Sequence, residues 1–384
     1  LKHNVCFRET DLGGKSYLVF PELINLKKPL LENEATEDGV AYTISGAIEN
    51  VYASMVVLLG YTQTFTRTNQ WRNQARYEVD DSLICGFCQE GERDGELDFV
   101  LYFGTNVPAS VRTLFQGLFE SFLGRRNLTV FRYEPLFCPE CGQPLDRSVA
   151  RTKLREGKAF TFCNDCGGKL TLPKAHEPIQ LTQQQQTEVE NQRRVADVRT
   201  RFEQAIYSVK AYVKDQGIKV PECFISYAWG ETQHERWVER NLATDLQKAG
   251  IDVVLDRWEN AKIGASMLRF VERALKSDRV IVVGTPLYRE KYDNGDPMRG
   301  FVLASEGDLI GKRMLGTESG KETILPALLA GTEETSFPPL LQCRVYADFR
   351  DNTTYFSTAF NVILSLYQIP PTDPAVADLC ESLR

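Results

Sequence analysis

The stretch CFISYAW, residues 223–229, decides how the C-terminal part of this chain is interpreted. It is a short apolar run that stops at Gly230 and leads into a polar, amphipathic segment, which is typical of a buried strand followed by a site. Further along, the stretch ASEGD at residues 304–308 places Glu306 where the segment after the third apolar run begins. We expect the end of the strand and this carboxylate to share one cleft.

Residues 220–384 alternate between short apolar runs and segments with helical apolar spacing. The predicted strands are 222–227, 252–255, 280–284, 323–328 and 343–346, and the predicted helices include residues 237–246, 267–275 and 356–367. This alternation predicts a parallel sheet covered on both faces. Ligands in such folds bind beyond the carboxyl ends of the strands. The residues expected there are Ala228, Trp229, Asp256, Arg257, Trp258 and Thr285.

Several ordered motifs in this region resemble a TIR domain, in particular the bacterial TIR and SEFIR branch. They are FISYAW at 224–229, IDVVLD at 251–256, the loop at 257–264 and VIVVGTP at 280–286. The resemblance implies a flavodoxin-like parallel-sheet domain over residues 220–384. TIR domains either associate as scaffolds through their loops or cleave NAD at the nicotinamide–ribose bond.

For an NAD-cleaving TIR domain, the resemblance implies that Glu306 is the catalytic carboxylate, because Glu290 comes too early in the sequence. A carboxylate beside the ribose would stabilise the positive charge that develops as neutral nicotinamide leaves. Many TIR enzymes carry an aromatic residue four positions before this glutamate. Here Val302 occupies that place and Phe301 lies beside it, so Phe301 is the aromatic candidate for binding substrate.

Three further residues are candidates for binding NAD. Trp258 would stack on a base or on the nicotinamide ring, and Arg257 would meet the diphosphate. Trp229, at the exit of the first strand, would face them. In the structural alternative, Trp258 covers the sheet edge and Arg257 forms a surface salt bridge.

Two functions follow from the resemblance. The first is a TIR NAD hydrolase, a defence or signalling effector that oligomerisation through the TIR domain or binding of a partner activates. The second is a non-catalytic TIR or SEFIR-like adaptor that recruits like domains through the loop containing Gly264. The carboxylate of Glu306 is the feature that distinguishes them.

Two CxxC pairs, each followed by glycine, lie in the middle of the chain: Cys138 with Cys141, and Cys163 with Cys166. Four cysteines in two such turns predict a closed tetrahedral zinc site, which is structural rather than catalytic. The segment resembles a zinc ribbon, and we assign it residues 136–175. Zinc ribbons often contact nucleic acids. Its loop is rich in basic residues, namely Arg147, Arg151, Lys153, Arg155 and Lys158, although a charged loop is more often a solvated face.

The first 135 residues have the mixed pattern of an α+β domain. Predicted strands lie at 17–21, 51–59, 75–79, 82–87 and 97–102, and apolar spacing predicts a helix over 111–122. The stretches YLVFPELINLKKP at 17–29 and WRNQA at 71–75 resemble the COR domain of Roco proteins. That resemblance implies a regulator of an adjoining nucleotide-binding module or protein partner; the alternative is an unrelated packing domain. Within this domain Cys85 and Cys88 are expected to be buried free thiols.

A glutamine run at 183–186 opens a long charged segment with apolar residues at spacings of three and four, which predicts a linker helix over 183–217. The helix either couples the two halves of the chain or packs on its own domain. We assign four domains: 1–135, 136–175, 183–217 and 220–384.

Composition limits the function classes. The chain has 384 residues, a net charge of −7 and a pI near 5.3, which argues against a broad nucleic-acid or anionic-membrane surface. Cysteines in CxxC pairs favour metal binding and reduced thiols, and hence the cytoplasm. No apolar run predicts a membrane helix and no signal-peptide pattern is present. Because the chain begins with Leu1, we expect it to be a processed or truncated piece of a longer protein.

Overall fold

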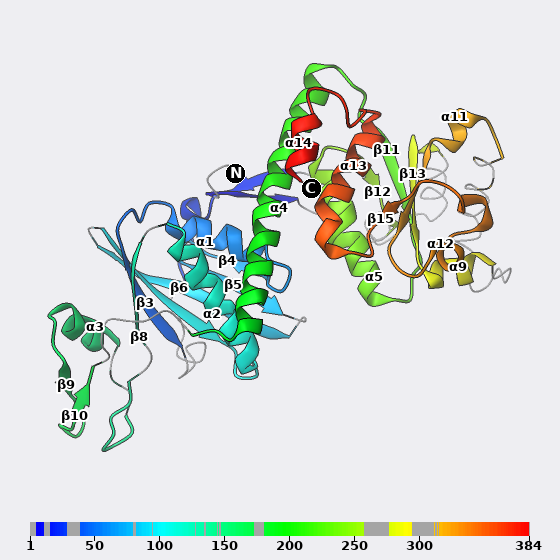
Figure 1. Cartoon of the computed structure of the whole chain (residues 1–384). Helices are drawn as coiled ribbons and strands as arrows, with labels where there is room; N and C mark the ends of the chain where they lie inside the picture. The colour runs from blue at the N-terminus through cyan, green and yellow to red at the C-terminus, as the bar shows by residue number, and fades with distance from the viewer. Residues whose placement is uncertain are drawn as a thin grey trace. The chain divides into compact units, whose positions relative to one another are not determined.

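The computed structural model describes most of the chain (Figure 1). The described residues are 5–10, 16–28, 39–79, 82–93, 95–126, 128–133, 136–143, 145, 147–172, 180–256, 276–293, 311, 313 and 315–383. Contacts divide them into an N-terminal unit, mainly Leu18–Thr200, and a C-terminal unit, mainly Arg201–Arg384.

The N-terminal unit is built on a six-stranded antiparallel sheet in the order β4-β5-β6-β7-β3-β8. Its strands are β3 (Val40–Ser45), β4 (Thr66–Gln70), β5 (Gln74–Val79), β6 (Leu83–Arg93), β7 (Glu96–Phe103) and β8 (Thr129–Tyr133). The strands predicted at 75–79, 82–87 and 97–102 are confirmed as β5, β6 and β7. A separate two-stranded sheet joins β1 (Phe7–Thr10) and β2 (Ser16–Val19), of which residues Arg8–Tyr17 are grouped with the C-terminal unit, and the 3-10 turn η1 (Pro21–Leu23) follows in the chain.

Two helices, α1 (Val51–Gly60) and α2 (Ala109–Gly124), contribute to the core of this sheet. The helix predicted over 111–122 is thereby confirmed. Aromatic rings fill the layer between sheet and helix: the centroids of Phe99 on β7 and Phe119 on α2 are 5.8 Å apart, and those of Phe65 and Phe115 are 5.0 Å apart. Edge-to-face pairs of this kind add to the stabilisation that burial supplies.

The strand predicted at residues 51–59 is wrong, because this segment is the helix α1. Every residue from Val51 to Leu59 is buried, so the helix has no polar face and its sequence lacks a helical period. A continuous apolar run does not distinguish a buried helix from a buried strand. The β-branched residues Val51, Val56 and Val57 then favoured the strand, and burial on all sides overrode that preference.

The long helix α4 (Gln183–Asp215) confirms the helix predicted over 183–217, and its role as a linker stays a prediction. Within the N-terminal unit, its residues Val189 and Ala196 belong to the core. The side-chain oxygen of Gln192 accepts the backbone N–H of Gln63 at 2.8 Å. Within the C-terminal unit, Phe202 packs on another ring, as described below. The division between units falls inside α4, and the four assigned domain boundaries stay predictions.

The C-terminal unit contains a parallel sheet in the order β12-β11-β13-β14-β15. Its strands are β11 (Glu222–Ser226), β12 (Asp252–Val254), β13 (Arg279–Gly284), β14 (Ile324–Leu328) and β15 (Ala347–Asp348). The predicted parallel sheet is confirmed, with one strand misplaced. The prediction of 343–346 is wrong, since Cys343 has a φ of 66° and Val345 is 97% exposed, so the strand begins only at Ala347.

Helices accompany this sheet on both of its faces. They are α5 (Thr232–Trp237), the π turn η2 (Val238–Ala243), α6 (Thr244–Lys248), α9 (Pro286–Asp293), α11 (Glu318–Lys321), α12 (Glu333–Ser336), α13 (Tyr355–Tyr367) and α14 (Ala377–Ser382), with short 3-10 turns η3 (Pro339–Leu341) and η4 (Asn352–Thr354). Figure 1 shows α13 on one side of the strands and α9 with α12 on the other. The helix predicted over 267–275 lies outside the described residues.

The π turn explains an irregular spacing in the sequence. Trp237 and Leu242 are five residues apart, whereas Leu242 and Leu246 are four apart. A π turn closes over five residues, so it accommodates the longer step. Leu242 and Leu246 are both buried. The helix predicted over 237–246 is thus confirmed as α5, η2 and α6 in succession.

Alternate residues of the strands are buried on opposite sides. Phe224, Val280 and Val282 pack with Tyr288 of α9 and with Phe337. Their neighbours in sequence are buried as well, including Cys223, Ile225, Ile281 and Val283. A sheet whose strands are apolar on both sides must be covered on both faces. Among the described residues, no helix is long and apolar enough to cross a membrane.

Candidate functional sites

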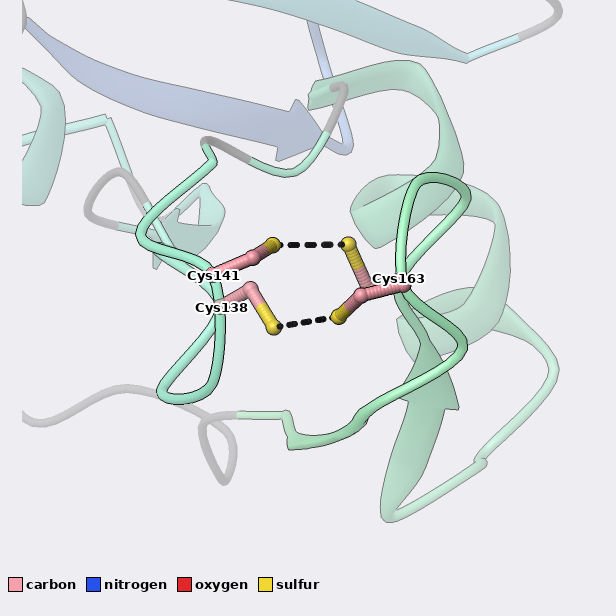
Figure 2. A group of neighbouring side chains, drawn as sticks. Cys138, Cys141 and Cys163 are labelled. Carbon is pink, nitrogen blue, oxygen red and sulfur yellow. Dashed lines mark hydrogen bonds between the residues drawn. The ribbon is translucent and has the colours of Figure 1, made fainter.

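The four predicted zinc ligands come together. Their sulfur atoms all lie within 4.8 Å of one another. The sulfurs form two pairs: those of Cys138 and Cys166 are 3.4 Å apart, and those of Cys141 and Cys163, both labelled in Figure 2, are 3.6 Å apart. In a tetrahedral site with zinc–sulfur bonds of about 2.3 Å, the sulfurs lie roughly 3.8 Å apart. The donor set therefore has the dimensions of a closed tetrathiolate centre.

The first cysteine turn is held by its own backbone. The N–H of Cys138 donates to the carbonyl of Gln143 at 2.8 Å, and the N–H of Gly142 donates back to the carbonyl of Cys138 at 2.8 Å. Gly142 has a φ of 73°, in the left-handed region where a side chain is strained. This requirement is the physical reason for a glycine directly after the second cysteine.

The second turn repeats the first. The N–H of Cys163 donates to the carbonyl of Gly168 at 2.8 Å, the N–H of Gly167 donates to the carbonyl of Cys163 at 3.0 Å, and φ at Gly167 is 74°. The N–H of Gly168 also donates to the sulfur of Cys166 at 3.4 Å. Two alike turns that aim amides at sulfur favour the thiolate form, which is the form that binds a metal.

Backbone amides lower the pKa of these thiols, and the neighbouring sulfur atoms raise the pKa at Cys166. The hydrogen bond from the Cys141 backbone is the largest influence on Cys138 and lowers its pKa to about 7. For Cys166 the Gly168 amide lowers the pKa, but the nearby sulfurs of Cys141 and Cys138 raise it further, to about 12. A cation at the centre of the four sulfurs would offset the repulsion between neighbouring thiolates. Four thiols and no other donor leave no open position, which suits a structural site.

A small core supports the two turns. Strands β9 (Phe160–Phe162) and β10 (Lys169–Thr171) pair antiparallel, and the helix α3 (Arg147–Arg155) precedes them. Cys138 and Cys163 are buried with a few aliphatic side chains: Leu145, Ala150, Leu170 and Leu172. So few apolar residues rarely stabilise a fold alone, and a metal is a common supplement. Leu154 of α3 also packs against Ala41 and Val100 of the six-stranded sheet.

The other cysteine pair has no such geometry. Cys85 and Cys88 are buried in β6 and form no disulfide, as predicted. Burial raises the pKa of Cys85 to about 12. Cys88 accepts a weak hydrogen bond from the side-chain amide of Asn73 at 3.6 Å. Within the part of the chain that the structure describes, the four ribbon cysteines are the one group suited to a metal.

The carboxyl edge of the parallel sheet is the second candidate site. The chain leaves β11 for its neighbour β12 on one side and later forms β13 on the other side. In doubly wound sheets with this strand order, ligands bind outside the carboxyl ends of the strands where the order reverses. Trp229 follows β11 and Thr285 follows β13, so both lie at this switch point.

Three of the four predicted edge residues that the structure describes lie in the interior. Ala228, Asp256 and Thr285 are buried. The hydroxyl of Thr285 accepts the N–H of Tyr288 at 3.1 Å, and the Tyr288 hydroxyl lies 3.0 Å from that of Ser226. Of the predicted edge residues that the structure describes, Trp229 alone presents substantial surface, with 43% of its area exposed.

Two charged side chains that the sequence did not single out hold the loop at Trp229. The buried carboxylate of Glu235 accepts the N–H of Gly230 at 2.6 Å. The Lys291 ammonium donates to the carbonyl oxygen of Trp229. Gly230 has a φ of 117°, which only glycine adopts readily. The backbone is thus fixed while the indole ring faces solvent. In the sequence Glu235 is one of several acidic residues in a polar segment, so no sequence signal pointed to this contact.

The remaining site predictions lie outside the described residues. They are Arg257, Trp258, Gly264, Phe301 and Glu306. The predicted cleft between the end of β11 and Glu306 therefore stays a prediction.

Comparisons with known proteins bear on the C-terminal unit. Residues 223–364 match the family described as TIR domain. A crystal structure of a prokaryotic SEFIR domain is similar at 21% identity, covering 40% of this chain and 97% of the other, with a TM-score of 0.31. No curated protein matches the chain. The TIR resemblance seen in the sequence is supported, whereas the COR-like resemblance gains no support.

Proposed function

We propose that the TIR domain at residues 223–364 is an NAD hydrolase that cleaves the nicotinamide–ribose bond and is activated by association of TIR domains or by a partner. The observation that carries the proposal is the family match on a parallel sheet whose first strand ends in the half-exposed Trp229 at the switch point. This is the position at which sheets of this order bind ligands.

The proposed reaction requires one catalytic side chain. The bond between the nicotinamide ring nitrogen and the ribose anomeric carbon breaks, both electrons leave with nicotinamide, and the cationic pyridinium ring becomes a neutral pyridine. The Glu306 carboxylate stabilises the oxocarbenium-like ribose, and water then adds at the anomeric carbon and releases a proton. The products are nicotinamide and ADP-ribose.

Substrate binding in this proposal combines stacking and charge pairing. The Trp229 ring offers a surface for the adenine or nicotinamide ring. Trp258 and Phe301 are the other proposed stacking partners, and Arg257 is the proposed partner of the diphosphate. Arg257 and Trp258 directly follow Asp256, which lies past the carboxyl end of β12, next to β11.

The test is NAD turnover by the full chain, free in solution and clustered on a multivalent support. We expect turnover that rises on clustering and that Glu306→Gln abolishes. Glu290→Gln is the matched control, since Glu290 is an exposed carboxylate on α9 and should leave turnover unchanged. If the clustered wild-type protein leaves NAD intact while it still self-associates, the hydrolase proposal fails and the adaptor function takes its place.

We further propose that the four ribbon cysteines hold a structural zinc ion. The sulfur separations, the two alike turns and the absence of any other donor type in the cluster support this choice. None of the ten cysteines forms a disulfide, which fits the reducing cytoplasm, our proposed location. The N-terminal unit is the proposed regulatory part of this defence or signalling protein, facing a partner or a nucleotide-binding module.

A further inference from the structure

The six-stranded sheet of the N-terminal unit ends in the strands β4 and β8. An edge strand presents a row of backbone N–H and C=O groups with which a strand of another molecule can pair. Within the described residues, β8 pairs with β3 alone, and Thr129, Val130 and Phe131 form no hydrogen bond outside this ladder. The described part of the chain thus leaves the outer row of β8 open to a partner strand.

The opposite edge of the sheet is protected against such pairing. The register of β4 on β5 shifts between Arg67 and Asn69, where a bulge or a similar irregularity interrupts the ladder. The sequence of this strand, TRTNQ at 66–70, contains no apolar residue. A bulge twists an edge strand away from a straight partner, and proteins use this to keep edges from pairing. β4 is therefore a poor template for another strand.

β8 lacks both of these protections. Its ladder with β3 runs in one continuous register, from Thr129 opposite Ser45 to Tyr133 opposite Ala41. The central residue of the strand is Phe131, and 42% of its surface is exposed. A straight edge with an exposed aromatic side chain at its centre favours pairing with another strand.

The one charged residue of β8, Arg132, does not guard this edge. Its guanidinium lies 3.3 Å from the carboxylate of Glu120 on α2, and both side chains are nearly buried. Val130 packs against the core of the N-terminal unit, to which α2 contributes. Because successive residues of a strand point to opposite sides of the sheet, Phe131 points away from α2 and from this ion pair.

The sequence of β8 is complementary to itself in an antiparallel pair. A two-fold axis at Phe131 places this residue directly opposite Phe131 of a second copy. Directly opposite residues point to the same side of the sheet, so the two exposed rings would meet, and aromatic cross-strand pairs stabilise sheets. The same register places Val130 opposite Arg132 of the second copy, so no like charges face each other. An interface of two-fold symmetry requires such a self-complementary patch.

We propose that β8 pairs antiparallel with β8 of a second copy of this chain, in the register centred on Phe131, and joins the two six-stranded sheets into one. A stable interface buries about 1,200–2,000 Å², and a five-residue edge is smaller than this. The dimer should therefore form at micromolar or higher concentrations. This surface lies outside the TIR domain, and the pairing does not depend on NAD hydrolysis.

A β8 dimer would carry two C-terminal units on one scaffold. Linked modules meet at a higher effective concentration than free ones. The dimer would thereby assist the association of TIR domains, a consequence that rests on the proposed activation of the hydrolase. NAD turnover of Phe131→Lys should then fall below that of the wild type at concentrations where the wild type is dimeric.

Charge variants of the full zinc-loaded chain test the pairing by sedimentation velocity, from low micromolar to submillimolar concentration. Phe131→Lys and Phe131→Glu each place like charges opposite each other, and each should raise the dissociation constant of the dimer about tenfold. An equal mixture of the two variants should dimerise again, because an ammonium group then faces a carboxylate. This rescue also shows that both variants are folded. Thr68→Lys, at an exposed position on β4, is the control and should dimerise like the wild type.

A disulfide reports the register itself. Directly opposite residues of an antiparallel pair have Cα atoms about 4.5 or 5.5 Å apart, and both distances suit a disulfide. Phe131→Cys should therefore form a symmetric disulfide on mild oxidation, identified by peptide mass spectrometry. Thr68→Cys, on the other edge, should not form one.

Four results would overturn the proposal: a wild type that stays monomeric, a Phe131→Lys variant that dimerises as the wild type does, a mixture that dimerises no better than its components, or a Phe131→Cys variant that cross-links no better than Thr68→Cys. A dimer that persists in Phe131→Lys assigns self-association to another surface. A wild type without NAD turnover contradicts the hydrolase proposal alone, since sedimentation and cross-linking still decide the pairing of β8.

Discussion

The ammonium of Lys248 lies 2.9 Å from a carboxylate oxygen of Glu203, and both side chains are buried. Glu203 belongs to α4 and Lys248 to α6. A second carboxylate, Asp245, lies 3.6 Å from the same ammonium and accepts the hydroxyl of Tyr355 at 2.9 Å. Next to this cluster the rings of Phe202 and Phe356 are 5.2 Å apart. Residues 201–215 of α4 are thus part of the C-terminal unit itself.

The first prediction concerns this buried cluster. Lys248→Met removes the ammonium group that pairs with two buried carboxylates, which should cost about 3–5 kcal/mol of unfolding free energy. Hydrogen exchange of the β13 amides in the full chain measures the C-terminal unit alone. Lys219→Met is the control, since Lys219 pairs with Asp278 at 2.8 Å in an exposed position and should matter far less. Equal effects of the two substitutions would contradict the assignment.

The zinc proposal predicts about one zinc ion per purified chain. Chelation should accelerate amide exchange in β9 and β10 and leave β11 and β13 protected, because the metal closes only the small ribbon core. Cys163→Ser should lose the metal, whereas Cys343→Ser, at an exposed cysteine in the other unit, should keep it. Metal analysis that finds no zinc in the wild-type protein excludes the site.

Turn geometry gives a separate prediction for Gly167. A left-handed φ of 74° costs an L-residue about 1–2 kcal/mol, so Gly167→Ala should weaken zinc binding by roughly tenfold in competition with a chelator. Gly124→Ala, at the end of α2, is the control, because an added Cβ there meets no atom within 4 Å. Unchanged zinc affinity in Gly167→Ala would show that the turn relaxes without cost.

The loop at Trp229 should depend on Glu235. Glu235→Ala leaves the Gly230 amide without its buried acceptor, a loss of about 1–3 kcal/mol in local stability. We expect faster exchange of the Gly230 amide by NMR. Glu231→Ala removes an exposed carboxylate that pairs with His234, and should leave that amide protected. Comparable exchange in both variants would rule out the anchoring role.

Thiol reactivity should follow burial. Burial raises the pKa of Cys85 and of Cys223 to about 12, so at pH 8 both are neutral thiols and shielded from reagent. Iodoacetamide should alkylate the exposed Cys343 of the folded protein and spare the other two, as read by peptide mass spectrometry. Cys85 should react only after denaturation; labelling at the rate of Cys343 would mean that β6 opens readily.

Sequence patterns predicted the helices and strands that are determined by the order of apolar residues within one segment. β13 is a continuous apolar run, as expected of a buried strand, and α13 has apolar residues at helical spacing. In both, the order of apolar residues matches the side chains that are buried. The cluster of four cysteines was predictable because each CxxC spacing brings two thiols together and two such pairs are typical of one metal site. The helix α1 was not predictable, since burial on every side removes the period that identifies a helix.

Contacts between distant residues were beyond sequence reasoning. Glu203 and Lys248 pair across 45 residues, and neither side chain differs in sequence from an ordinary surface charge. Glu235 likewise reads as one more acidic residue in a polar segment. Such contacts depend on how helices pack, which no local pattern encodes.

The continuity of α4 has a consequence for how these units can be exchanged between proteins. Val189 and Ala196 complete the core of one unit, and Phe202, Ile206 and Val209 are buried further along the same helix. A recombination break at residue 220, where the TIR-like sequence begins, would separate the C-terminal unit from apolar side chains and from Glu203. A transplanted segment that begins at residue 220 should therefore fold well only when residues 201–215 accompany it.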